Sequence, residues 1–143
     1  MLDSIPIRAA FHRGPVCQAY NEAAFRYFLA VERARAERSQ RVLYLVLITI
    51  RQSTGRPAKI ADPTAAALFR GLGTSVREVD FVGWFREGQV ASAVLAQGPK
   101  PPGSKVAPLV AQRIIAELTK RLSTTDSSHL RVRVVRLGGS VAV

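Results

Sequence analysis

Apolar residues recur at two different spacings along the chain, and each change of spacing marks a new element. A helical spacing, with Asn21 as N-cap, predicts a helix that begins near Gln18 to Asn21 and ends at about Ser39. The next run, Val42–Ile50, is apolar on both faces. This pattern is typical of a central strand covered on both sides, or covered on one side and paired in a dimer on the other.

A second, shorter helix is predicted after a polar loop at residues 51–61. Asp62 suits the N-cap and Pro63 the first helical position, because proline lacks an N–H that would be unpaired there. Four apolar residues follow at helical spacing: Ala65, Leu68, Phe69 and Leu72. Gly71 and Gly73 are expected to end this helix.

A β-hairpin is predicted next, and the chemically informative residues lie in it. Strands at residues 79–85 and Val90–Ala96 flank a polar turn of Arg86, Glu87, Gly88 and Gln89. A glycine in the turn supplies the positive φ that a tight hairpin needs. The only tryptophan, Trp84, lies next to this turn.

The last third of the chain is predicted to form a helix and a strand. Ser104 follows a loop rich in glycine and proline and is the expected cap of the helix. The expected buried face of that helix consists of Val110, Ala111, Ile114, Ile115, Leu118 and Leu122. In the strand at residues 129–137, apolar residues alternate with Arg131 and Arg133, which predicts one face open to water.

The resulting order is one helix followed by β-α-β-β-α-β. This order predicts an α+β fold with a ferredoxin-like antiparallel sheet, in which Val42–Ile50 and Val90–Ala96 are the central strands and the helices pack on one face. We expect a single domain at residues 18–139, preceded by a loosely held arm at 1–17 and followed by a short tail at 140–143.

Net charge is the most informative property of the composition. The chain of 143 residues has a formal net charge of +11, and 17 of its 21 basic residues are arginine. Arginine binds phosphate in a bidentate way and stacks on flat rings. Two explanations of this excess stay open: an anionic partner, which could be a nucleotide, a nucleic acid or an acidic protein surface, and a GC-rich genome, which favours arginine codons.

The remaining composition excludes several classes of function. The longest apolar run is too short to cross a bilayer, and no signal-peptide pattern is present, so we expect a cytoplasmic protein without membrane insertion. A single cysteine and two isolated histidines offer neither zinc spacing nor a nucleophile–base pair. No phosphate-binding glycine loop is found. We expect no cofactor, no metal site and no catalytic residues.

At its centre the chain resembles a GGDEF domain, the fold of diguanylate cyclases, over about residues 21–139. Residues 20–25 resemble the family's segment in which an Asn-Arg-Arg-x-Phe run precedes a helix. Arg77 and Asp80 match the family's R-x-x-D inhibitory motif, which stands five residues before the signature turn. In this register the five signature positions fall on residues 86–90.

The departures from the family pattern are as informative as the match. The two acidic signature positions fall on Gly88 and Gln89, and the strand position of the other metal-binding aspartate falls within Ile48, Thr49 and Ile50. Two-metal chemistry needs carboxylates to hold hard cations near the triphosphate. The resemblance is therefore to a degenerate GGDEF domain, and we expect no cyclase activity.

The resemblance implies a regulatory module, and three modes of action stay open. In the first, Arg77 and Asp80 clamp cyclic di-GMP, with Arg70 as a second arginine that balances the ligand's charge. In the second, Trp84, Phe85 and Arg86 form a surface for a partner protein or a homodimer, with no nucleotide ligand. Nucleic-acid binding ranks last, because charge alone supports it.

Overall fold

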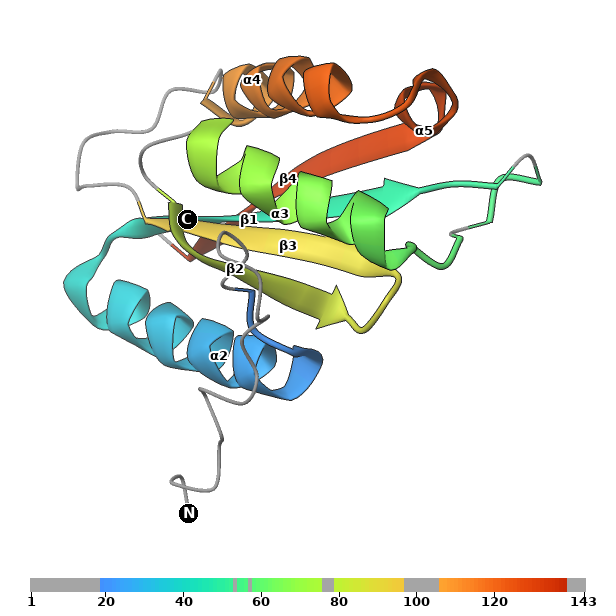
Figure 1. Cartoon of the computed structure of the whole chain (residues 1–143). Helices are drawn as coiled ribbons and strands as arrows, with labels where there is room; N and C mark the ends of the chain where they lie inside the picture. The colour runs from blue at the N-terminus through green and yellow to red at the C-terminus, as the bar shows by residue number, and fades with distance from the viewer. Residues whose placement is uncertain (1–18, 53, 57, 76–78, 97–105, 139–143) are drawn as a thin grey trace.

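The structure is a computed structural model, and it describes residues 19–52, 54–56, 58–75, 79–96 and 106–138 (Figure 1). Its elements are α2 (Glu22–Ser39), β1 (Val42–Ile50), α3 (Asp62–Ser75), β2 (Val79–Arg86), β3 (Val90–Ala96), α4 (Val106–Arg121), α5 (Thr124–Ser128) and β4 (Leu130–Gly138). The predicted arm, the tail and the Ser104 cap lie outside the described residues. No helix within the described ranges is both long enough and apolar enough to cross a membrane.

The four strands form one antiparallel sheet in the order β2-β3-β1-β4. Val46 of β1 pairs with Ala93 of β3 on one side and with Val134 of β4 on the other. The prediction that β1 and β3 are the adjacent central strands is confirmed, as is the α+β class. An antiparallel sheet needs only short connections between β2 and β3, and the turn at residues 87–89 provides one.

Helices cover both faces of the sheet, so the domain has three layers (Figure 1). Helices α3 and α4 pack on one face, as expected, over a core that includes Ile48, Leu68, Leu72, Ile114 and Leu118. Helix α2 packs on the other face over a smaller core of Phe25, Leu29, Ala36, Leu43, Leu45 and Val94. Burial from two sides explains why β1 is apolar at nearly every position.

Both predicted ends of α3 are wrong. The N–H of Ala65 donates to the carbonyl of Ala61, so the helix begins at Asp62 and Asp62 is not its cap. The helix also continues through Gly71 and Gly73 to Ser75. A Cβ added at Gly71 would overlap Leu118 of α4, so this glycine permits close packing of the two helices instead of ending one of them.

The two glycines of α3 give a matched test of this packing. Alanine usually stabilises a helix interior by about 0.5–1 kcal/mol relative to glycine. Nothing lies within 4 Å of a Cβ added at Gly73, so Gly73→Ala should raise the free energy of unfolding by that amount. Gly71→Ala should instead lower it by about 1–3 kcal/mol, because Leu118 must move. Urea denaturation of both variants measures the difference, and equal effects would contradict the packing.

The C-terminal part corrects two further predictions. Ile115 is 39% exposed, so it does not belong to the buried face of α4. A short helix, α5, was not predicted; its cap is Ser123, whose hydroxyl accepts from the N–H of Asp126. His129 ends α5, and the last strand starts one residue later, at Leu130. The Ser-x-x-Asp spacing at residues 123–126 was the available signal for this cap.

Glu117 of α4 forms salt bridges with two basic residues of the same helix. Glu117 pairs with Arg121 at 2.9 Å and with Lys120 at 3.7 Å. The hydrogen bond from Arg121 holds the pKa of Glu117 below its usual value. Because these groups lie at the surface, the pairs contribute little to stability.

Candidate functional site

The hairpin turn is fixed to the first turn of α2 by its only carboxylate. The N–H of Glu22 donates to Glu87 Oε1 at 2.9 Å, and the N–H of Glu87 donates to Glu22 Oε1 at 2.7 Å. A carboxylate at a helix N-terminus satisfies an otherwise unpaired donor and interacts favourably with the helix dipole. Gly88 has a φ of 73°, which places the turn in the left-handed region that favours glycine.

The chain just before α2 is held against the same hairpin by main-chain bonds. Tyr20 donates to the carbonyl of Val82 and accepts from the N–H of Trp84, both at 3.0 Å. A Cβ at Gly83 would lie 2.6 Å from the Tyr20 carbonyl oxygen, so only glycine permits this approach. Helix α2 and the hairpin therefore form one connected unit.

The residues predicted as an interaction surface lie in different environments. The expectation that Trp84 is exposed is wrong: its side chain is 7% exposed and packs edge-on against Phe69 of α3, with ring centroids 5.1 Å apart. Side chains alternate along a strand, so Phe85 lies on the opposite face, half-buried, with the guanidinium of Arg26 4.2 Å above its ring. Arg86 is exposed.

The residues predicted to clamp a ligand are not brought together by the part of the chain that the structure describes. Arg77 lies outside the described residues, and for Asp80 only the main chain in β2 is described. Arg70 is exposed near the end of α3.

The structure describes the positions at which the resemblance places the metal-binding acids. Gly88 and Gln89 lie in the turn, and the Ile48 and Ile50 side chains are buried on the α3 and α4 face of the sheet. Across the described ranges, no group of three or more His, Cys, Asp or Glu residues could hold a metal ion. The one acid in the turn, Glu87, is the residue that binds the start of α2.

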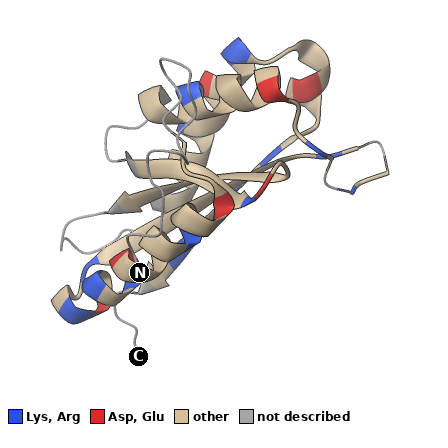
Figure 2. Cartoon of the chain, turned by 60° about the horizontal axis from the view of Figure 1, so that its bottom comes forward, with Lys and Arg blue, Asp and Glu red and all other residues tan. Residues whose placement is uncertain are grey.

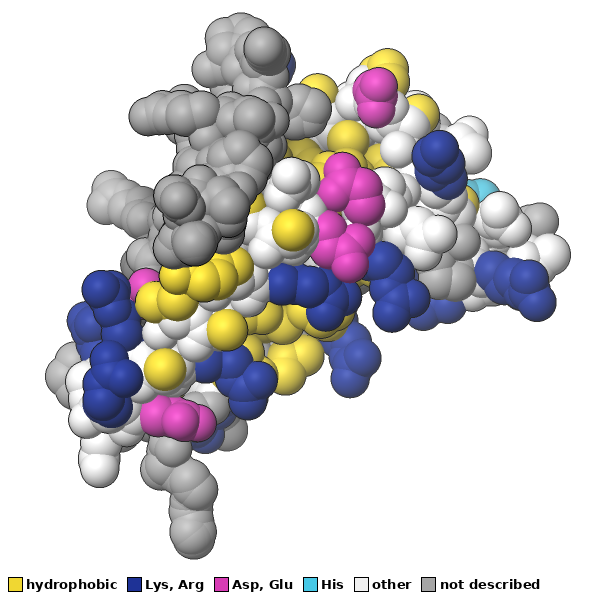
Figure 3. Space-filling view, turned by 90° about the horizontal axis from the view of Figure 1, so that it is seen from below, with side chains coloured by type: hydrophobic (Ala, Val, Ile, Leu, Met, Phe, Trp, Pro, Cys, Tyr) yellow, Lys and Arg dark blue, Asp and Glu magenta, His cyan; other side chains and the backbone are white. Residues whose placement is uncertain are grey.

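A hollow on the α2 face of the sheet lies beside the turn. We call it the arginine hollow. Its lining consists of Leu47, Thr49, Arg51, Phe85, Arg86, Val90, Arg131, Val132 and Arg133, and its volume is about 470 Å³. Four arginines and no carboxylate line it. Other basic residues are spread over α2, the sheet and α4 (Figure 2). Figure 3 shows this face, where dark blue side chains surround exposed hydrophobic atoms.

Strand register brings these arginines together from distant parts of the sequence. Thr49 pairs with Arg131 and Leu47 with Arg133 across β1 and β4, while Arg86 pairs with Val90 in the hairpin. The alternation of Arg131 and Arg133 was visible in the sequence, but their meeting with Arg51 and Arg86 depends on the strand order. Local sequence patterns therefore do not reveal this site.

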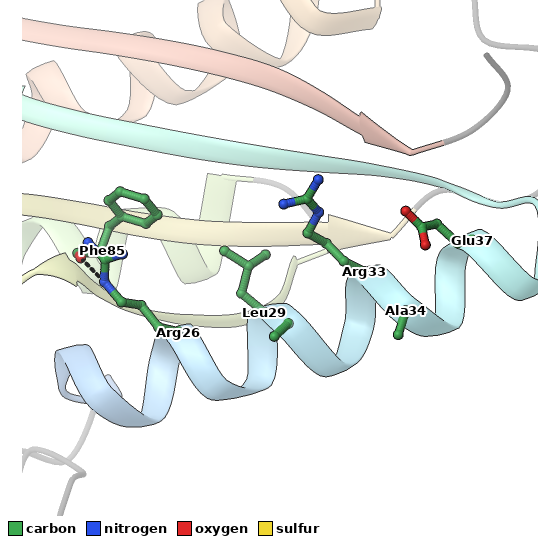
Figure 4. A pocket seen from close by; sticks show the side chains of 7 residues that line it. Arg26, Leu29, Arg33, Ala34, Glu37 and Phe85 are labelled. Carbon is green, nitrogen blue, oxygen red and sulfur yellow. Dashed lines mark hydrogen bonds between the residues drawn. The ribbon is translucent and has the colours of Figure 1, made fainter. Parts of the chain in front are cut away.

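A second hollow adjoins the first, since Phe85 lines both. We call it the α2 hollow, and it is lined by Arg26, Leu29, Ala30, Arg33, Ala34, Glu37 and Phe85. In Figure 4 the side chains of Leu29 and Arg33 point from α2 toward the strands. The Nε–H of Arg26 donates to the carbonyl of Phe85 at 2.9 Å.

No protein-family model matches the chain, and no curated protein matches its sequence. Several solved structures are similar, among them the following three. A diguanylate cyclase (DGC) protein from Thermotoga maritima is 12% identical over 86% of this chain and 83% of its own, with a TM-score of 0.56. The FimX GGDEF domain from Pseudomonas aeruginosa is 18% identical over 91% and 82%, with a TM-score of 0.52.

The third is the GGDEF domain of TpbB, also called YfiN, from Pseudomonas aeruginosa. It is 20% identical over 87% of this chain and 74% of its own, with a TM-score of 0.56. Likeness at these identities establishes the fold. The chain has a GGDEF-like fold, as the resemblance of the hairpin and the leading helix indicated.

Proposed function

We propose that this GGDEF-like domain is a catalytically silent regulatory module that acts by binding. One observation carries the proposal: the only acid in the turn, Glu87, is engaged in reciprocal hydrogen bonds with Glu22 at the start of α2. The neighbouring signature positions are Gly88 and Gln89, which have no carboxylate to offer. The turn is thus a structural connection to α2.

Nucleotide cyclisation needs charges that this turn lacks. Two divalent cations must neutralise the triphosphate and activate the attacking hydroxyl, and hard cations are held by carboxylate oxygens. The strand position that would supply another acid lies within Ile48, Thr49 and Ile50. The side chains of Ile48 and Ile50 belong to the apolar core. None of these three side chains is a carboxylate.

Cyclic di-GMP is the ligand that we propose for the module. The R-x-x-D pair of Arg77 and Asp80 supplies the donor and acceptor that a guanine edge and a phosphate require. Arg70, exposed near the end of α3, is the second arginine of the proposed site. A dianionic ligand held by one arginine would keep an uncompensated charge, so two cations are needed.

Arg77→Ala is expected to cost about 1.5–3 kcal/mol of affinity for cyclic di-GMP, the usual loss for a charge-assisted hydrogen bond, with little change in melting temperature. Titration calorimetry of the wild type and this variant measures the loss. Arg113→Ala on α4 is the control, since Arg113 is also exposed and should have no effect. Equal binding by wild type and Arg77→Ala, or no binding by either, overturns the receptor proposal.

The second candidate function is a protein-binding or dimerising module without a nucleotide. Phe85, which lines two adjoining hollows, and the exposed Arg86 favour it, because aromatic and arginine side chains are enriched at interfaces. Sedimentation of the purified chain, with and without cyclic di-GMP, separates the two candidates. A dimer that forms without ligand and loses stability in Phe85→Ala supports the second.

A further inference from the structure

The arginine hollow concentrates positive charge without compensation. The side chains of Arg86 and Arg133 make no hydrogen bond or ion pair with another described residue. The guanidinium groups of Arg51 and Arg131 donate only to main-chain carbonyls, those of Gly55 and Leu130. Four like charges around one hollow repel one another, so an anion that enters it gains attraction from all four.

The shape of the hollow favours a small ligand. Its volume of about 470 Å³ falls in the range of roughly 300–1,000 Å³ that is usual for small-molecule sites. Leu47, Val90 and Phe85 contribute apolar side chains to its lining, and the arginines come from the residue after β1, the end of β2 and β4. Rigid strands hold three of these four side chains, which favours a site of defined geometry.

We propose that the arginine hollow binds a compact polyanion with adjacent phosphate groups, and that it does so without a divalent cation. Guanidinium groups bind phosphate oxygens through paired, charge-assisted hydrogen bonds. The four positive charges of these guanidinium groups balance the three to four negative charges of a triphosphate. The lining holds no carboxylate that could share a cation with the ligand. This inference concerns residues other than Arg77, Asp80 and Arg70, and so it goes beyond the proposed function.

Protection of a sheet edge does not account for the arrangement. Charged residues on an edge strand prevent pairing with other chains, and β4 is an edge strand of this sheet. That explanation covers Arg131 and Arg133, and Arg86 at the end of the other edge strand, β2. It does not cover Arg51, which follows the central strand β1, nor the meeting of arginines from both edges in one hollow.

The proposal predicts an unusual response to magnesium. In a cyclase, Mg²⁺ assists triphosphate binding, because acidic ligands and phosphates share the cation. Here Mg²⁺ would occupy phosphate oxygens that the arginines need and would lower the ligand's charge. Affinity for a triphosphate should therefore fall when Mg²⁺ is added and rise when it is chelated.

The test is titration calorimetry of the full chain with inorganic tripolyphosphate at 0.15 M salt, with EDTA and then with Mg²⁺. Arg86→Gln and Arg133→Gln should each weaken binding roughly 10- to 100-fold, the loss of one charge-assisted hydrogen bond. Arg113→Gln, on the opposite face of the domain, is the matched control and should bind as the wild type does. A parallel titration with GTP separates binding of the phosphates alone from binding of a nucleotide. Tighter binding of GTP than of tripolyphosphate would indicate that the base contacts Phe85.

The proposal is overturned if neither tripolyphosphate nor GTP binds in EDTA, if binding is stronger with Mg²⁺ than without it, or if Arg113→Gln loses as much affinity as Arg86→Gln and Arg133→Gln do. Binding of a single-stranded oligonucleotide in the absence of any tripolyphosphate binding would also overturn it and assign the charge to nucleic acid. Loss of cyclic di-GMP binding in Arg77→Ala alone leaves the proposal standing, because Arg77 is not part of the hollow's lining.

Discussion

Replacing Phe25 with alanine is expected to lower the free energy of unfolding by about 3–5 kcal/mol, the usual cost of truncating a buried phenylalanine. The Phe25 side chain is fully buried between α2 and the sheet. Its ring meets Phe81 of β2 edge-on, with centroids 5.4 Å apart. Such a loss is a large share of the total stability of a domain of this size, about 5–15 kcal/mol.

This substitution tests whether α2 is an integral layer of the domain. The core under α2 is small, so the cavity left by one ring cannot be filled by its few neighbours. Unfolding by urea, followed by far-ultraviolet circular dichroism, measures the change. The variant should unfold at a lower denaturant concentration in one transition, because α2 and the sheet share hydrogen bonds at Tyr20 and Glu87.

Tyr27→Ala is the matched control for Phe25→Ala. Tyr27 is an aromatic residue of the same helix, but its side chain is 43% exposed. Its loss should cost less than about 1 kcal/mol, as surface substitutions usually do. Equal effects of the two substitutions, or a change below about 1 kcal/mol for Phe25→Ala, would mean that α2 does not pack on the sheet.

The strands were predictable because their patterns are local. β1 has the bounds expected from its run of apolar residues, and Gly88 identified the turn between β2 and β3. Asn21 caps α2 as predicted, since its side chain accepts from the N–H of Ala24. These features depend on residues a few positions apart, which is the distance over which sequence patterns are informative.

The errors arose where a distant contact decides the outcome. Gly71 resembled the end of a helix, but its missing side chain makes room for Leu118 of α4. Trp84 resembled an exposed residue near a turn, but Phe69 of α3 covers it. The arginine hollow was missed for the same reason, since Arg51, Arg86 and Arg133 meet only through the order of the strands.

The largest functional effect that we expect is the absence of cyclic di-GMP synthesis from GTP. Catalysis by two metal ions accounts for the activation of the nucleophile and the stabilisation of the leaving group. The turn offers Gly88 and Gln89 at the acidic positions, and its one acid binds α2. Gly88→Glu alone should not create activity, because the end of β1 still lacks an aspartate.

Incubation of the purified chain with GTP and either Mg²⁺ or Mn²⁺, with chromatographic detection of cyclic di-GMP, tests the central claim most directly. An active diguanylate cyclase under the same conditions serves as the positive control. We expect no cyclic di-GMP from the wild type or from Gly88→Glu. Product from the wild type that disappears when Gly88 or Gln89 is substituted would contradict a silent module and assign catalysis to this turn.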